Sequence, residues 1–176
     1  MSEYYIKTDD LKKQCPLLKV GDRVFLSGTV YTARDAAHKR MFEYINNGKE
    51  PPFIIDGAVI YYAGPTPTPE GLPIGSCGPT TSARMDVYTP RLLDMGLTAT
   101  IGKGERSQEV QDAIERNGSV YLCAIGGAGA LACRQIKSCK VIAFDDLGCE
   151  SVKKLEFTDF PLIVAIDCHG KNIFKR

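Results

Sequence analysis

The sequence lacks the features of several protein classes. No stretch approaches the roughly 20 apolar residues that cross a bilayer, and the first ten residues are acidic where a secretory signal needs a basic and then an apolar segment. Lys plus Arg number 22 against 21 Asp plus Glu, a net charge of +1, so no overall field attracts nucleic acid or lipid to the surface. We expect a cytoplasmic protein that binds neither nucleic acid nor membrane.

The cysteines and histidines form no pattern typical of a disulfide framework or a metal site. The seven cysteines are odd in number, and no two of them are spaced as Cys-x-x-Cys. Most lie among apolar neighbours and are expected to pack as small hydrophobic side chains, whereas Cys77 lies in a glycine-rich loop and stays unassigned. His38 and His169 form no catalytic pair, and a structural or supporting role is expected for His38. We expect no metal in this chain itself.

The composition that remains is that of an ordinary globular protein. The chain has 176 residues, of which 44% are apolar and 24% are charged, and this length suits one core. We therefore expect a single domain over residues 1–176, in which residues 1–18 form an N-terminal arm.

The first part of the chain is predicted to be mostly β-structure with one helix. Residues 20–33 are β-branched and aromatic with one glycine between, which predicts two short strands or one bulged strand. Asp56-Gly57 between two apolar runs predicts a β-hairpin. Residues 64–80 hold too much proline and glycine for regular structure and predict a surface loop that shapes a site. Residues 34–48 have helical spacing, with one stripe formed by Ala37, Met41, Tyr44 and Ile45.

The second half alternates between predicted helices and strands. Ser107 is the expected N-cap of a helix over 108–116. The other predicted elements are a helix over 81–95 that is bent or broken near Pro90, strands at 97–101, 119–125 and from 140, a helix over 126–136, and an apolar run over 160–167. This order implies a sheet covered by helices, with functional loops at the strand ends. The β-rich start argues against a simple doubly wound fold.

Three junctions between a loop and a helix bring cationic side chains to backbone donors. A helix that begins near Thr80 would place Arg84 on the same face as Thr80, and Lys103 follows a strand where open sheets bind ligands. Arg34 stands between a strand and a helix. Arg34, Arg84 and Lys103 together can present three positive charges to a small polyanion. The alternatives are that Thr80 caps a helix, that Arg84 pairs with a surface acid and that Arg34 is a surface group.

The motifs at these junctions resemble a known family. Segments 33–40, 78–86 and 102–107 occur in the order found in β subunits of iron-sulfur hydro-lyases of the class I fumarase and tartrate dehydratase type, and the resemblance runs from about Gly21 to Phe174. It implies an α/β fold, a swivelling β/β/α domain that has a mixed sheet or partial barrel with covering helices.

The resemblance also implies a division of labour within a hetero-oligomer. A partner α subunit would hold a 4Fe-4S cluster, while Arg34, Arg84 and Lys103 of this chain would bind the carboxylates of a small dicarboxylate substrate. Thr80 would move the proton at the carbon next to a carboxylate. The residues after Lys103, Gly-Glu-Arg-Ser-Gln, favour the reversible hydration of fumarate to malate. The alternatives are an L(+)-tartrate dehydratase β subunit and a non-catalytic anion-binding assembly module.

Overall fold

A computed structural model describes residues 1–124 and 133–175. Its strands form one mixed sheet in the order β1-β2-β3-β4-β5-β7-β6, and β7 also pairs with β2. The strands are β1 (Glu3–Lys7), β2 (Arg23–Thr32), β3 (Val59–Tyr61), β4 (Ala99–Gly102), β5 (Val120–Ala124), β6 (Ile136–Ala143) and β7 (Val152–Ile166). Strands β1 to β5 run parallel to their neighbours among these five, whereas β7 is antiparallel to β2, β5 and β6.

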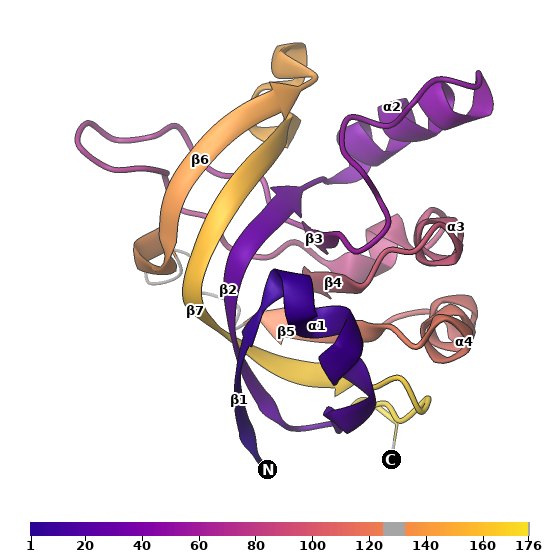
Figure 1. The fold of residues 1–176 in the computed structure, drawn as a ribbon. Coiled ribbons are helices and arrows are strands. Elements are labelled where there is room, and N and C mark those ends of the chain that lie inside the picture. Colours follow the sequence, from indigo (N-terminus) through magenta and orange to yellow (C-terminus); the bar gives the residue numbers. More distant parts are fainter. Residues whose placement is uncertain (125–132, 176) are drawn as a thin grey trace.

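The sheet closes on itself because β7 pairs with both β2 and β5. Strands β2, β3, β4, β5 and β7 thereby form a barrel-like ring (Figure 1). The helices are α1 (Thr8–Gln14), α2 (Asp35–Asn46), α3 (Thr89–Asp94) and α4 (Gln108–Asn117), with short 3-10 turns η1 (Cys15–Leu17), η2 (Ser82–Met85), η3 (Cys133–Gln135) and η4 (Asp145–Glu150). The expected α/β fold, a mixed sheet or partial barrel with covering helices, is confirmed. Within the described residues, no helix is both long and apolar enough to span a membrane.

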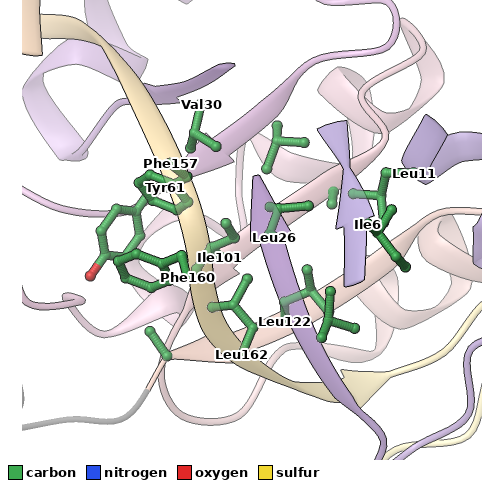
Figure 2. Close-up of a cluster of buried hydrophobic side chains, with 14 of the residues drawn as sticks. Ile6, Leu11, Leu26, Val30, Tyr61, Ile101, Leu122, Phe157, Phe160 and Leu162 are labelled. Carbon is green, nitrogen blue, oxygen red and sulfur yellow. The ribbon is translucent and has the colours of Figure 1, made fainter. Parts of the chain in front are cut away.

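Two apolar cores lie on the two faces of the sheet. Successive residues of a strand point to opposite faces, so Tyr61 joins the inner core while Tyr62 joins the outer core beneath the helices. Inside the ring, the Tyr61 side chain lies beside those of Phe157 and Phe160, whose rings stack at 4.1 Å between centroids (Figure 2). The outer core contains apolar residues of α2, α3 and α4, and this is the side on which these helices lie in Figure 1.

The N-terminal residues are built into this sheet. Strand β1 pairs with β2 along its whole length, and Leu11, Cys15 and Leu18 are buried in the inner core. Residues 1–18, expected as an arm, therefore supply one strand, one helix and part of the apolar interior.

The structure selects one bulged strand for the segment after Val20. Strand β2 shifts register between Leu26 and Gly28, and Gly28 has a φ of +114° with Thr8 packed against it, so a side chain there would collide with the Thr8 hydroxyl. The predicted helix after Arg34 is confirmed as α2. Its stripe differs toward the end: Ala37 and Met41 are buried, but Tyr44 is exposed.

One prediction in the middle of the chain is wrong and another is confirmed in part. Asp56-Gly57 forms a turn but no hairpin, because β3 pairs in parallel with β2 and β4, and residues 53–55 form no strand. The helix predicted over 81–95, bent or broken near Pro90, is broken just before that proline. The chain forms η2 and then α3, and Pro90 lies in the first turn of α3, where the missing N–H of proline costs nothing.

The remaining elements follow the predicted alternation. The Ser107 hydroxyl accepts from the Val110 amide at the start of α4, and Gly118 ends that helix with a φ of +61°. The last two strands begin earlier than predicted, at Ile136 and Val152. The helix expected over 126–136 falls largely on residues 125–132, which lie outside the described part of the chain.

Candidate anion-binding site

Three of the candidate residues lie at one edge of the sheet. Arg34 follows the carboxyl end of β2, and Lys103 follows that of β4. Thr80 joins them beside the end of β3, where its amide donates to the carbonyl of Tyr62 at 2.7 Å. Because β2, β3 and β4 are parallel neighbours, their carboxyl ends meet at the same edge, which is where open sheets place ligands.

The backbone holds Lys103 against the segment that follows Thr80. Thr81 and Lys103 form a parallel bridge, the Ser82 amide donates to the Lys103 carbonyl at 2.9 Å, and the Lys103 amide donates to the Ser82 hydroxyl at 3.1 Å. This approach requires glycine at position 102, since a Cβ there would lie 1.9 Å from Ser82 Oγ. The Lys103 side chain is exposed, and no acid of the described residues forms an ion pair with it.

The two candidate arginines meet at Asp35. Arg84 Nε donates to Asp35 Oδ1 at 2.9 Å, and Arg34 Nη2 lies 4.0 Å from Asp35 Oδ2. A second acid, Glu150, has its Oε1 atom 3.3 Å from Arg34 Nε. The exposed fractions of the side chains are 54% for Arg84 and 24% for Arg34, so solvent reaches the guanidinium of Arg84 more freely.

The expectation that Thr80 and Arg84 share one face of a helix is wrong. No helix begins near Thr80: η2 starts at Ser82, after Thr81, and no side chain caps it. The two residues therefore do not share a helical face, and Thr80 caps no helix. The alternative that Arg84 pairs with an acid is realised in Asp35, and this pairing brings Arg84 beside Arg34.

Unsatisfied polar atoms are concentrated at the start of α2. Among the described residues, the buried side-chain polar atoms without a hydrogen bond are Arg34 Nε, Asp35 Oδ2, His38 Nε2 and Thr98 Oγ1. Each such atom costs about 1–3 kcal/mol in an isolated fold. Native proteins rarely leave such groups unsatisfied, and three of these four atoms lie at the start of α2 beside the two arginines.

The His38 side chain is hydrogen-bonded to the backbone of Arg34. Its ring is fully buried between Tyr62 and Tyr88, with both ring centroids 5.6 Å away. Burial lowers the pKa of His38 to about 4, so the ring is neutral near pH 7. Its Nδ1 lies 2.9 Å from the Arg34 carbonyl oxygen, and since a carbonyl only accepts, Nδ1 carries the proton.

Sequence reasoning missed a buried arginine next to the site. The Arg106 side chain is 0% exposed: Nε donates to Asp86 at 2.6 Å, Nη2 donates to the Thr89 hydroxyl at 2.8 Å, and the guanidinium faces the rings of Tyr62 and Tyr121. Asp86 also accepts from the Ser107 amide at 2.6 Å. This network ties the segment of Arg84 to the segment of Lys103. Arg106 and Asp86 lie in the motifs 102–107 and 78–86, but nothing in their sequence spacing reveals that they pair in the interior.

The cysteines of the described residues do not fit an iron–sulfur cluster. No three histidine, cysteine or acidic side chains in this part of the chain are arranged to hold a metal ion. Burial raises the pKa of the Cys77 thiol to about 12, whereas the thiolate is the form that ligates iron. The Cys77 carbonyl accepts from the Tyr61 hydroxyl at 2.7 Å, which fixes this residue in the inner core.

A separate surface hollow of about 490 Å³ lies between α1 and the turn at 54–58. Lys12, Tyr31 and Ile54 contribute to its lining, and none of the four candidate residues does. It is therefore not the site assembled here.

Comparison with known proteins places these observations in a family context. The model of the family described as "Fumarase C-terminus" matches residues 2–176. The chain is 41% identical over 170 residues to fumarate hydratase 2 of Leishmania major, covering 96% of this chain and 30% of that protein. It is 43% identical over 159 residues to the anaerobic class I fumarate hydratase of Escherichia coli K12, covering 89% of this chain and 29% of that protein.

A third relative has nearly the same length as this chain. The putative L(+)-tartrate dehydratase subunit beta of Methanocaldococcus jannaschii is 40% identical over 171 residues, which cover 94% of this chain and 88% of that protein. The chain thus spans less than a third of the two fumarate hydratases but most of this subunit.

Proposed function

The chain belongs to the fumarase C-terminus family, and from this premise we propose that it is the β subunit of a hydro-lyase that interconverts fumarate and malate. The observation that carries the proposal is the meeting of Arg34, Arg84, Lys103 and Thr80 at the carboxyl edge of three parallel strands. Fumarate carries two carboxylates, and this edge offers three cations within a small region.

The proposed chemistry uses the cations to stabilise charge. When malate loses water, a proton leaves the carbon next to one carboxylate and the hydroxyl leaves the neighbouring carbon. The electron pair left by the proton spreads onto the adjacent carboxylate, so negative charge grows there in the transition state. Guanidinium groups bind carboxylates through two parallel N–H donors, and a fixed cation aimed at growing charge lowers the barrier.

We assign the proton transfer to Thr80. Its backbone is anchored through the Tyr62 carbonyl, and the following residue, Thr81, is bridged to Lys103, so Thr80 stands on a segment whose backbone is fixed beside that of Lys103. A threonine hydroxyl is a weak base alone, and neighbouring positive charge makes its deprotonated form less costly. Malate formation would return the proton to carbon by the reverse route.

A partner is part of the proposal. The Methanocaldococcus jannaschii relative is named a subunit beta, which supports a separate α subunit, and the shared segment is only about a third of the two fumarate hydratases compared above. We place the 4Fe-4S cluster in that subunit, where it would provide Lewis-acid chemistry toward the substrate hydroxyl. The described residues of this chain do not fit the cluster. The cytoplasmic location stays a prediction.

The decisive experiment is an assay of the reconstituted complex. The chain is purified with its co-eluting partner, reconstituted anaerobically with iron and sulfide, and mixed with fumarate or malate while the ultraviolet absorbance of fumarate is followed. We expect interconversion in both directions and a loss of at least about thirtyfold in kcat/KM for Thr80→Ala. An active complex that Thr80→Ala leaves unchanged would remove Thr80 from the mechanism.

L(+)-tartrate dehydration is the second candidate. The 40% identity to the putative L(+)-tartrate dehydratase subunit beta of Methanocaldococcus jannaschii favours it, and the same cationic edge suits a hydroxylated diacid. The assay therefore includes L(+)-tartrate, with formation of the 2-oxo diacid as the signal. A preference for tartrate would replace fumarate in the proposal. A complete, metal-loaded complex that turns over neither diacid would instead identify a non-catalytic anion-binding module.

A further inference from the structure

The Arg34 side chain is surrounded by three parts of the chain, which contain Asp35, Gly64 and residues 149–150. Glu150 faces its Nε at 3.3 Å, and Asp35 lies 4.0 Å from its Nη2. On a third side is Gly64, where a Cβ would lie 3.0 Å from Arg34 Nη1 and 3.2 Å from the Cys149 carbonyl oxygen. A free arginine side chain samples many rotamers, and ordering it on ligand binding reduces affinity.

We propose that Glu150 is a positioning residue for the carboxylate-binding site, because it holds the guanidinium of Arg34 in one orientation before a diacid arrives. This inference rests on the proposed function, in which Arg34 binds a substrate carboxylate. Glu150 acts on Arg34 and is not itself assigned a contact with the substrate.

The backbone that carries Glu150 is fixed by a buried lysine. Lys153 is 8% exposed, and its ammonium donates to the carbonyl oxygens of Gly148 (3.1 Å), Cys149 (3.0 Å) and Ser151 (3.3 Å) and to the Ser151 hydroxyl (2.7 Å). No carboxylate of the described residues pairs with it. The lysine thus binds the backbone on both sides of Glu150. Burying a charge is costly unless it is hydrogen-bonded, and the hydrogen bonds that compensate this cost hold the segment in one conformation.

The same segment is anchored to the strand that leads into Arg34. The Lys153 amide donates to the Thr32 hydroxyl at 3.1 Å, and that hydroxyl lies 3.4 Å from the Ser151 carbonyl oxygen, to which it donates. Thr32 is the last residue of β2, two positions before Arg34. Glu150 and Arg34 are therefore both held relative to the end of β2, so their mutual position is set by the sheet.

A second ion pair between η4 and α2 provides a matched control. Asp146 Oδ1 accepts from Arg40 Nη1 at 2.6 Å, and the Arg40 guanidinium lies over the Phe144 ring at 5.2 Å. Like Glu150, Asp146 is an acid of η4 that pairs with an arginine of the α2 region. Its side chain is 66% exposed, and neither partner is a residue of the site.

Charge and position predict opposite effects at Glu150. Removing this negative charge raises the positive potential around Arg34, which by itself strengthens anion binding. Releasing Arg34 from its fixed orientation weakens binding, since the ligand must then order the side chain. Weaker diacid binding without Glu150 is therefore a signature that a purely electrostatic role does not produce.

The first experiment follows Arg34 in the full protein by NMR relaxation of the arginine ¹⁵Nε–¹Hε groups. In the wild type we expect the Arg34 group to be as rigid as the Arg106 group, and in Glu150→Ala we expect it to become clearly more mobile than in the wild type. Asp146→Ala should leave Arg34 rigid. A mobile Arg34 in the wild type, or one that stays rigid in Glu150→Ala, would overturn the proposal without reference to any activity.

The second experiment measures KM and kcat of the reconstituted complex. For Glu150→Ala we expect the diacid KM to rise about threefold to tenfold, the cost of ordering one long side chain, with a smaller change in kcat. Glu150→Gln, which keeps the shape and one acceptor, should restore part of the affinity, and Asp146→Ala and Asp146→Gln should match the wild type. A lowered KM in both Glu150 variants means that charge alone acts there, and the positioning role fails.

The two proposals fail in distinguishable ways. A complex that is inactive in the wild type refutes the proposed function, and the Arg34 relaxation then decides the positioning role alone. An active complex whose Glu150→Ala variant has an unchanged diacid KM refutes the positioning role only. Equal melting temperatures of Glu150→Ala and Asp146→Ala show that neither result comes from unfolding.

Discussion

Two arginine regions meet at the short turn η2 and differ in how their charges are satisfied. Arg106 is fully enclosed, and its donors reach an acid and three hydroxyls while its faces contact two aromatic rings. Arg84, two residues before the acid that pairs with Arg106, is more than half exposed and makes one hydrogen bond, to Asp35. Arg34, beside the same Asp35, has a buried Nε that makes none.

The difference separates a structural cation from the two cations that we propose bind a ligand. A buried charge is tolerable only when its partners are complete, and Arg106 meets that condition with the chain's own atoms. Arg84 makes a single hydrogen bond, and Arg34 Nε makes none, although Glu150 lies 3.3 Å from it. Completeness of pairing, rather than residue type, distinguishes the two roles. The following predictions test that distinction, from the largest expected effect to the smallest.

Arg106→Met tests the structural region. It leaves Asp86 without its ion-pair partner, as a carboxylate that is 13% exposed, and also removes the donor from three hydroxyls. Breaking one partner of a buried pair costs about 3–5 kcal/mol. We expect the free energy of unfolding, measured by urea denaturation, to fall by that amount. A loss below about 1 kcal/mol would show that Arg106 is not a structural cation and would erase the contrast with Arg84.

Arg84→Met tests the ligand region and should show the reverse pattern. A single charged contact to the transition state contributes about 2–4 kcal/mol, so kcat/KM of the reconstituted complex should fall about thirtyfold to a thousandfold. The unfolding free energy should change by at most about 1 kcal/mol, because an exposed ion pair contributes little to stability.

The matched control for Arg84→Met is Arg116→Met. Arg116 is 50% exposed and donates to Asp94 at 2.9 Å from two nitrogens, so it resembles Arg84 in exposure and pairing but lies on α4. It should lose as little stability as Arg84→Met and retain full activity. Equal losses of activity in both variants would mean that exposed arginines act here through general charge.

The fold was predictable wherever one local pattern determined the outcome. Helical spacing and a Ser107 cap predicted α2 and α4, and the β-rich start argued against a simple doubly wound fold. The hairpin at Asp56-Gly57 was wrong because the turn is local, while the partners of β3 are strands far along the chain. Pairing across long separations leaves no signal in a short window of sequence.

The candidate site divides in the same way. Arg34, Thr80, Arg84 and Lys103 stand in motifs, and their resemblance to a family brought them together. Glu150 stands in no motif, and it reaches Arg34 only because β7 pairs with β2 and carries η4 to the end of that strand. A contact that depends on how a sheet closes is visible only after folding.

His38 lies between the two arginine regions and should make stability depend on pH. Its ring contacts Tyr62, whose ring also faces Arg106, and its Nδ1 donates to the Arg34 carbonyl. The folded-state pKa is lowered from 6.5 to about 4, mainly by burial. Between these values the unfolded chain binds the extra proton and the folded chain does not, so stability falls as pH drops from about 6.5 to 4.

The size of this effect follows from the shift and is up to about 3 kcal/mol, at roughly 1.4 kcal/mol for each pKa unit. The measurement is the free energy of unfolding between pH 7.5 and 4, compared with His38→Asn. The amide nitrogen of asparagine replaces Nδ1 as a donor but does not titrate. If both proteins lose stability equally over this range, acidic groups elsewhere cause the loss and His38 is not buried in its neutral form.

Gly64→Ala should give the smallest effect, because it moves Arg34 without removing any group. The φ of Gly64 lies outside the left-handed range, so alanine is allowed by the backbone, and the cost comes from contacts of 3.0 and 3.1 Å with Arg34 and 3.2 Å with the Cys149 carbonyl oxygen. The carbonyl is part of the backbone that Lys153 holds, so the arginine must yield by a few tenths of an ångström. We expect the diacid KM to rise about threefold, and the unfolding free energy to change by about 1 kcal/mol.

A double-mutant cycle with Arg34→Met decides whether Arg34 carries the effect. If it does, Gly64→Ala changes KM in the wild-type background and has no further effect once Arg34 is removed. An equal change of KM in both backgrounds would mean that the added methyl group acts on the Cys149 backbone instead. The position of Arg34 would then not control diacid binding.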